Sequence, residues 1–322
     1  MAVYTKINKK NILSIEKIFH LGKIVSFKGI KKGIENTNYF LKTKKNKYIL
    51  TIFEKRVSSK DLPFFMELMH GLSKLKIKCP KPLETSKGKY LIKIKNKNAC
   101  LVTFLEGKDK NNLTSNDCYE AGKNIAKLHL ASKKLKIFRK NSLSISAWPK
   151  LINTIDNQSK KIQIDLLKLM RTNLSIIKKR WPKNLPIGII HGDLFIDNIF
   201  FYKKKFYGFI DFYFSSSDFL SYELAICINS LCFNKKKNKF IFDKQKASNL
   251  LKGYQKYRKL NSKEKKHFNV LCRGAALRYL LTRVYDYSNT PKTAFIKIKD
   301  PKEYIQKLMF HSKINKFNNY IR

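Results

Sequence analysis

Hydrophobic and polar positions along the first hundred residues predict a small sheet with helices beside it. Residues 8–20 carry apolar side chains at helical spacing, and so do residues 61–76, where Asp61 can cap the helix and Pro63 falls in the first turn. Strand patterns occur at 25–43, at 47–56 and twice within 89–107. A turn that contains Gly29 and Gly33 interrupts the first of them. The pattern indicates a mainly antiparallel sheet.

After Gly107 the pattern becomes mostly helical. Helical periods cover 115–132, most of 150–180 up to the Trp-Pro pair at 181–182, and most of the chain from Asp218 to about Met309. Two short strands, 199–202 and 206–210, lie between these helical stretches. The chain is therefore expected to be α+β, with a small sheet-rich lobe at 1–106, a larger helical lobe at 107–322 and the VTFLEG segment as the hinge.

The formal charge of +47 suggests a nucleic-acid partner, but the kind of basic residue argues against one. Only nine of the 69 basic residues are arginines, whose planar fork makes the bidentate contacts that read bases. The lysines are spread along the whole chain and accompany a bias toward Asn, Ile, Phe and Tyr that an AT-rich coding sequence would produce. We expect weak binding of polyanions at low salt and no specific nucleic-acid partner.

The remaining composition indicates a folded cytoplasmic protein with no membrane partner. No apolar run approaches the roughly 20 residues of a membrane helix, and Lys, Asn and Glu break up the N-terminal stretch where a secretion signal would lie. Six scattered cysteines without a C-x-x-C pair are typical of reduced, buried thiols.

One segment, IIHGDLFIDNIFFYKKKFYGFIDF at 189–212, places carboxylates and an amide among apolar runs, where they are costly unless they are used. The spacing from His191 through Asp193 to Asn198 fits the kinase catalytic loop H-x-D-x-x-x-x-N. Asp211 follows 13 positions after Asn198, beyond the predicted hairpin, where kinases carry the Asp of D-F-G. Phosphoryl transfer requires a carboxylate at the attacking hydroxyl and oxygen ligands for magnesium, which these three residues supply.

The segment resembles the aminoglycoside-phosphotransferase-like small-molecule kinases, a branch of the protein-kinase-like fold, and within them the bacterial homoserine kinases. The resemblance extends over almost the whole chain. It is carried by SFKGIKKGIENTNYFL (26–41), ILTIFEKR (49–56), DLPFFMELM (61–69), LVTFLEG (101–107), KLHLAS (127–132), HGDLFIDNIFF (191–201), IDFYFS (210–215), YELAICIN (222–229) and RGAALRYLLTRVYDYSNTP (273–291).

The resemblance implies ATP and Mg²⁺ as cofactors and assigns roles to residues of these motifs. Asp193 would be the catalytic base or would orient the substrate hydroxyl, and Asn198 and Asp211 would be the metal ligands, although Asn198 also suits a turn. Hinge and loop residues would bind the nucleotide. The hinge residues are Thr103, Phe104 and Leu105, and those of the loop over the phosphates are Gly33, Asn36 and Asn38.

The chain departs from the kinase pattern at the lysine expected on the third strand, because Thr51 stands there. Lys42 or Lys55 is a candidate to reach the phosphates instead. Glu67 is the candidate for the acid that pairs with such a lysine, and it is equally typical of an exposed helix carboxylate.

The substrate residues are predicted from charge. Homoserine is a zwitterion, and Arg273, Arg278 and Arg283 lie close together in a chain with few arginines. Residues five apart differ by roughly 140° on a helix, so all three cannot face one ligand. We expect one or two of them to bind the substrate, with Arg273 and Arg278 as the candidates, and the rest to form structural ion pairs, for example Arg283 with Asp286. Asp218 either receives the ammonium group or caps the helix after it.

The hypothesis is a kinase that phosphorylates the hydroxyl of L-homoserine, a step toward threonine. One alternative is another small-molecule kinase of the same fold, acting on an aminoglycoside, choline, ethanolamine or methylthioribose. The other is a basic nucleic-acid-binding protein on an inactive kinase scaffold.

Overall fold

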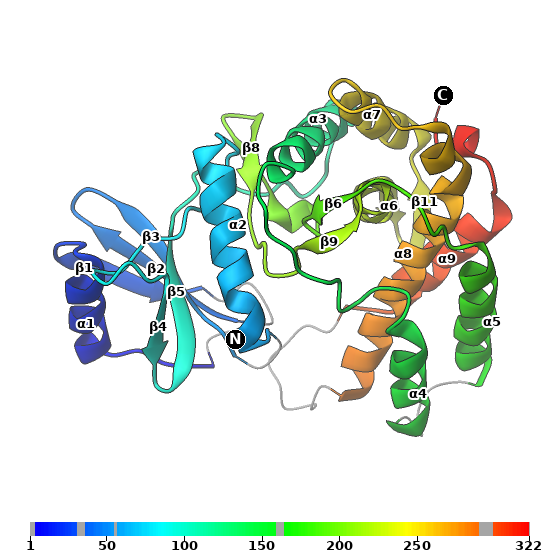
Figure 1. Ribbon diagram of the computed structural model, residues 1–322. Coiled ribbons are helices and arrows are strands. Elements are labelled where there is room, and N and C mark those ends of the chain that lie inside the picture. Colours follow the sequence, from blue (N-terminus) through cyan, green and yellow to red (C-terminus); the bar gives the residue numbers. More distant parts are fainter. Residues whose placement is uncertain (1–3, 31–35, 55–56, 159–163, 290–298, 322) are drawn as a thin grey trace. The chain divides into compact units, whose positions relative to one another are not determined.

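A computed structural model describes residues 4–30, 36–54, 57–158, 164–289 and 299–321, without the side chains of 157, 158 and 164 (Figure 1). Gly33 and Lys55 lie outside the described residues. Contacts within the chain divide it into two compact units. The first comprises the described residues up to Glu106 together with Gly208–Tyr213, and the second comprises the chain from Gly107 to Tyr207 and most of the residues after Tyr213.

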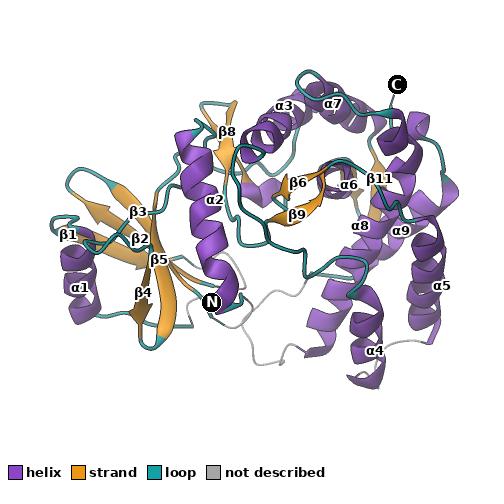
Figure 2. Cartoon of the chain, in the orientation of Figure 1, coloured by secondary structure: helices purple, strands orange, loops and turns teal. Residues whose placement is uncertain are grey.

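The first unit contains a five-stranded sheet in the order β1-β2-β3-β5-β4, and each neighbouring pair is antiparallel (Figure 2). Its elements are α1 (Lys9–Phe19), β1 (Ile24–Gly29), β2 (Thr37–Thr43), β3 (Lys47–Ile52), α2 (Leu62–Lys74), β4 (Leu91–Ile94) and β5 (Lys97–Thr103). The antiparallel sheet expected from the alternating pattern is thus confirmed. The Lys-Asn turn between β4 and β5 has positive φ at Lys95 and Asn96, which suits a tight hairpin.

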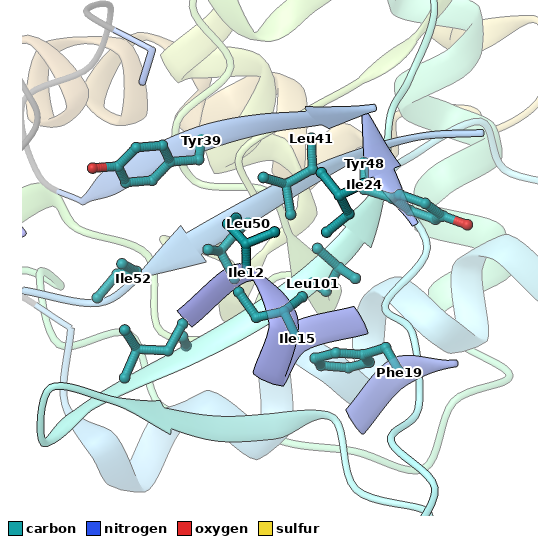
Figure 3. Packing of buried hydrophobic residues seen from close by; sticks show 12 residues of the cluster. Ile12, Ile15, Phe19, Ile24, Tyr39, Leu41, Tyr48, Leu50, Ile52 and Leu101 are labelled. Atoms are coloured by element: carbon teal, nitrogen blue, oxygen red, sulfur yellow. The ribbon is translucent and has the colours of Figure 1, made fainter. Parts of the chain in front are cut away.

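Helix α1 covers one face of this sheet. Ile12, Ile15 and Phe19 repeat at helical spacing, so they form one stripe, and this stripe packs on Leu41 and Leu50 of the central strands (Figure 3). Burial of each such side chain contributes about 1.5–3 kcal/mol. The cluster fixes the register of β2 and β3, because a slip of one residue would turn its side chains to the other face.

The opposite face of the sheet carries the alternate residues. Along β2 these are Asn38, Phe40 and Lys42, since successive side chains point to opposite faces and Tyr39 and Leu41 belong to the α1 cluster. Thr51 on β3 is paired with Asn38 in the ladder, so it shares this second face. One face is therefore a hydrophobic core, and the other is mixed in character.

The second unit is mainly helical. Its helices are α3 (Ser115–Ser132), α4 (Trp148–Gln158), α5 (Ile164–Arg180), α6 (Leu220–Leu231), α7 (Lys244–Gln255), α8 (Ser262–Asn289) and α9 (Lys302–Lys313). Helix α6 is buried along almost its whole length and packs on α8, and these two helices form the centre of the unit. The α+β fold with a sheet-rich N-terminal part and a helical C-terminal part is confirmed.

The short strands of the chain's second half pair two by two. They are β6 (Ile187–Ile190) with β9 (Ser216–Phe219), β7 (Ile199–Tyr202) with β8 (Lys205–Phe209), and β10 (Phe233–Lys236) with β11 (Lys239–Phe242). The region after Asp218 is mostly helical, as expected, and the β10–β11 hairpin is an addition that the pattern did not indicate. Phe233 and Phe242 face each other across it and pack on Phe310 of α9, so the aromatic pairs stabilise a hairpin in a lysine-rich segment.

Two further features concern the helices and the cysteines. Among the helices that the structure describes, none is both long enough and apolar enough to cross a membrane. All six cysteines are buried and free, as the sequence predicted.

Candidate active site

The predicted catalytic loop connects β6 to the 3-10 turn Ile196–Asn198 in the second unit. Gly192 adopts φ +78°, a left-handed conformation that L-residues avoid, and a Cβ on it would lie 2.8 Å from the carbonyl oxygen of Phe214. Only glycine fits this bend. The bend turns the chain directly before Asp193, whose side chain is partly exposed.

A buried carboxylate holds the backbone of this bend. Glu223 on α6 is fully buried and accepts hydrogen bonds from the backbone N–H groups of His191 and Gly192. His191 is also fully buried, and its Nδ1 accepts the N–H of Asp193 at 3.3 Å. Because one side chain accepts two consecutive backbone N–H groups, Glu223 holds both residues of the bend in place.

Asp193 and Asn198 are in direct contact. The Asn198 amide donates to the backbone oxygen of Asp193 at 2.8 Å and to its carboxylate Oδ2 at 3.3 Å. Both donors of the amide are thereby directed at Asp193. The Asn198 Oδ1 receives no hydrogen bond within the described parts of the chain. A rigidly held oxygen without a donor is what a hard divalent cation requires of a ligand.

Arg278 of α8 lies beside this loop. Its Nη1 donates to the carbonyl oxygen of Gly192 at 3.0 Å, whereas its buried Nε has no hydrogen-bond partner among the described residues. Burial alone would lower the pKa of Arg278, but its neighbours Tyr279, Tyr222 and Asp193 outweigh burial and raise its pKa. Arg278 is therefore a charged, buried guanidinium whose hydrogen bonds are not all used.

Asp218, predicted to contact the substrate, lies in the same neighbourhood. Its Oδ2 accepts the Asn141 amide at 2.6 Å and its Oδ1 accepts the N–H of Phe219 at 2.7 Å. Burial raises the pKa of the Asp218 carboxyl, while those two hydrogen bonds and the charge of Arg278 oppose the increase. Asp218 is not the helix cap that the sequence also allowed, because it lies in β9 and the N-cap of α6 is Phe219.

The buried Tyr222 joins the cluster through its hydroxyl, which has no hydrogen-bond partner among the described residues. Burial raises its pKa, and Arg278 and Asp218 lie close enough to influence it. Asp193, Arg278, Asp218 and Tyr222 thus form one group of side chains with charges of both signs and unused hydrogen-bonding atoms.

The other two arginines of α8 make structural contacts. Arg273 donates from Nε and Nη2 to the Asn173 side-chain oxygen on α5, at 2.9 and 2.7 Å. Arg283 forms an ion pair with Glu303 of α9 at 2.6 Å. Of the three arginines, Arg278 contacts the catalytic loop, whereas Arg273 and Arg283 form contacts between helices.

Asp211 belongs to the first unit by its contacts. It is exposed and adopts φ +64°, a conformation rare outside glycine and frequent at functional sites. Two residues later, the Tyr213 ring packs edge-on against Phe53 and Phe65, which attaches this segment to the first unit.

The candidate phosphate-binding residues of the first unit lie in two separate places. Asn38 accepts the Thr51 hydroxyl at 2.8 Å, so the position that holds a lysine in kinases is part of a neutral pair. Asn36 is buried, and its side-chain oxygen has no partner among the described residues. Lys42 is exposed at the far end of β2, where its ladder partner is Lys47, and is not brought to the asparagines.

The hinge residues follow β5. Thr103 exchanges hydrogen bonds with Lys81, and Phe104 contacts the Phe40 ring edge-on at 5.4 Å. The backbone N–H of Leu105 has no hydrogen-bond partner within the described residues. Glu67 is exposed on α2 and affects the pKa of Tyr90, and no described lysine pairs with it.

Sequence reasoning missed several residues of the site. Glu223 had a signal, because it is a lone acid inside the apolar SYELAICINSL segment, and Tyr279 adjoins the candidate Arg278. No pattern in the sequence pointed to Asn141 or Tyr222. Among the described residues, no group of three or more His, Cys, Asp or Glu side chains could hold a metal unaided.

Comparison with known proteins identifies the family of this chain. Residues 26–260 match the phosphotransferase enzyme family. The chain therefore belongs to that family, and it is a phosphotransferase.

Within the family, its curated relatives include homoserine kinases that align over nearly their whole length. The relative from Rhizobium meliloti is 41% identical over 314 residues, which cover 98% of this chain and 95% of the relative. The relative from Paramagnetospirillum magneticum is 41% identical over 317 residues, which cover 97% of this chain and 96% of the relative. The chain thus belongs to the homoserine kinase family.

Solved structures show the fold. An amicoumacin kinase in complex with AMP-PNP and Ca²⁺ has a TM-score of 0.70 at 15% identity, with 97% of each chain covered. A choline kinase from Cryptosporidium parvum has a TM-score of 0.66 at 15% identity, with 95% of each chain covered.

Proposed function

We propose that this protein transfers the γ-phosphoryl group of ATP to the side-chain hydroxyl of L-homoserine, producing O-phospho-L-homoserine. The observation that carries the proposal is the identity of about 40% to curated homoserine kinases over nearly the full length of both chains. The group of side chains around Asp193 supports it, because it offers what a hydroxyl-bearing zwitterion needs.

Asp193 is the residue we assign to the substrate hydroxyl. Its carboxylate is fixed by Asn198 on one oxygen, and its backbone is fixed through Glu223 and Arg278 on either side of Gly192. A carboxylate held in this way orients the attacking hydroxyl and accepts its proton as the oxygen–phosphorus bond forms and the bond to the leaving ADP breaks.

Arg278 and Asp218 are the residues we assign to the substrate's charged groups. The guanidinium, with its unused Nε, suits the carboxylate of homoserine, and Asp218 suits the ammonium group. The unpartnered Tyr222 hydroxyl supplies a further hydrogen bond beside them. Arg278 and Asp218 would bind the charged carboxylate and ammonium groups of the amino acid, and Asp193 would face the hydroxyl of its side chain. A cationic amino alcohol has no carboxylate for Arg278, so the unused Nε of the guanidinium would stay without an acceptor.

By motif position we assign metal ligation to Asn198 in the second unit and, separately, to Asp211 in the first, and we assign the nucleotide to the second face of the sheet. The Asn198 Oδ1 has the required free lone pairs. Asp211 follows it at the spacing of a kinase metal ligand, in a strained backbone conformation. When bound, Mg²⁺ neutralises the phosphate charge. Asn36, Asn38 and the Leu105 backbone are the proposed nucleotide contacts.

A substrate screen with purified protein tests the proposal. ATP consumption is measured with homoserine, choline, ethanolamine, methylthioribose and an aminoglycoside, and the product is identified by phosphorus NMR. We expect turnover with homoserine and a kcat/KM at least about 100-fold lower for the cations, because a site built around an arginine repels them. Preferred turnover of a cationic alcohol would overturn the substrate assignment while leaving the kinase chemistry intact.

A further inference from the structure

We propose that Tyr279 is a positioning residue that holds the carboxylate of Asp193 in its reactive orientation. The inference deepens the proposed function and rests on the role given there to Asp193. Tyr279 follows Arg278 on α8, and its hydroxyl lies 3.0 Å from the carbonyl oxygen of Gly192 and 3.3 Å from Asp193 Oδ1.

Both oxygens of the Asp193 carboxylate are contacted by donors from different elements. Oδ1 faces the Tyr279 hydroxyl from α8, while Oδ2 faces the amide of Asn198 from the loop itself. A carboxylate bound on one oxygen can still rotate about its Cβ–Cγ bond, whereas donors on both oxygens oppose that rotation. Tyr279 therefore adds a restraint on Oδ1 that comes from α8 and not from the loop.

The Tyr279 ring is held from several sides, so its hydroxyl is a fixed point. Phe195 contacts it edge-on at 4.9 Å, Tyr304 lies at 5.2 Å, and the Arg278 guanidinium lies over the ring at 4.2 Å. The side chain is only 6% exposed. Buried tyrosine hydroxyls normally have hydrogen-bond partners, and here the partners are the loop carbonyl and the catalytic carboxylate.

The two acceptors share one hydroxyl proton. Gly192 O is also satisfied by Arg278 Nη1, so it does not depend on the tyrosine. The Tyr279 hydroxyl can therefore donate to Asp193 without leaving the buried carbonyl of Gly192 unpaired. This arrangement distinguishes a positioning role from a purely structural one, because loss of the hydroxyl would leave the loop backbone anchored.

The test is Tyr279→Phe, which removes the hydroxyl and keeps the ring. We expect kcat to fall about 10- to 100-fold, with the KM values for ATP and acceptor changed less than about threefold, since small misplacements of a reacting group have effects of this size. The matched control is Tyr304→Phe. It removes a buried hydroxyl that has no hydrogen-bond partner among the described residues, from the ring beside Tyr279, and kcat should stay unchanged.

A double-mutant cycle with Asp193→Asn separates the two explanations. If Tyr279 acts through Asp193, Tyr279→Phe lowers the residual activity of the Asp193→Asn enzyme by less than about twofold. Equal losses in both backgrounds, or a wild-type kcat in Tyr279→Phe, would overturn the inference. The cycle uses whichever acceptor the wild-type enzyme phosphorylates in the substrate screen, so an error in the substrate is distinguished from an error about Tyr279.

Discussion

Replacement of Glu223 by Gln tests how the fold holds the catalytic loop. The buried carboxylate accepts the N–H groups of His191 and Gly192, and an amide offers only one acceptor oxygen in the same volume. If the Gln oxygen takes the Oε2 position, the Gly192 N–H faces an NH₂ group where it had its 3.2 Å acceptor and keeps only a long contact of 3.4 Å. An unsatisfied buried donor costs about 1–3 kcal/mol, which corresponds to a Tm decrease of roughly 2–12 °C for a unit of this size.

The same change should affect catalysis more than stability. Asp193 directly follows the two anchored residues, and a displacement of about 1 Å at a reacting group can cost about 100-fold in rate. We therefore expect kcat to fall by about that factor. Thermal unfolding followed by circular dichroism and a coupled ATP-consumption assay, at a temperature well below Tm, measure the two effects separately.

The control is Glu264→Gln, at a second glutamate that is fully buried. Glu264 accepts hydrogen bonds from Arg258 and from the N–H of Asn261, away from the catalytic loop. This variant should lose comparable stability and retain kcat. If the two variants lose kcat equally, or if Glu223→Gln behaves as wild type, the proposed anchoring of the loop is refuted.

Further predictions concern the substrate, the metal and pH. Arg278→Lys should raise the KM for homoserine about 10- to 100-fold and leave that for ATP nearly unchanged, because a bidentate, charge-assisted contact is lost; an unchanged homoserine KM would remove Arg278 from the substrate site. Asp211→Ala should lower kcat by about 100-fold or more and shift the Mg²⁺ activation curve to higher concentration, and an unaltered Mg²⁺ titration would exclude it as a ligand. Burial, with Lys307 and Arg273 nearby, lowers the pKa of His311 to about 3. The unfolded chain therefore binds one more proton between about pH 6.5 and pH 3, and this residue removes about 1.4 kcal/mol of unfolding free energy per pH unit as the pH falls. Urea unfolding of His311→Gln should show a shallower loss of stability in that range, and an equal slope would contradict the burial argument.

The sequence predicted those parts of the fold that depend on local pattern. Alternation and helical periods identified the strands and helices of the first unit and helix α3, because their buried faces follow regular spacing. The β10–β11 hairpin was missed because four lysines and two asparagines together outnumber its four apolar residues. Its stability comes from Phe310, more than 60 positions later, and no local pattern reports such a contact.

The candidate site could be predicted only where a motif carries it. The spacing of Asp193 and Asn198 anticipated their contact, since five residues of tight loop bring the amide back to the carboxylate. Composition alone could not tell Arg278 from Arg273, which lie five positions apart on one helix. Their roles differ because one side chain faces the loop and the other faces Asn173 of α5.

The most direct test of the central claim is the turnover of Asp193→Asn with ATP and homoserine. The amide keeps the size of the side chain and removes the charge that accepts the hydroxyl proton. We predict that kcat falls about 1,000-fold or more while the Kd for ATP, measured by titration calorimetry, changes by less than about threefold. A kcat close to that of the wild type would contradict the role assigned to this carboxylate.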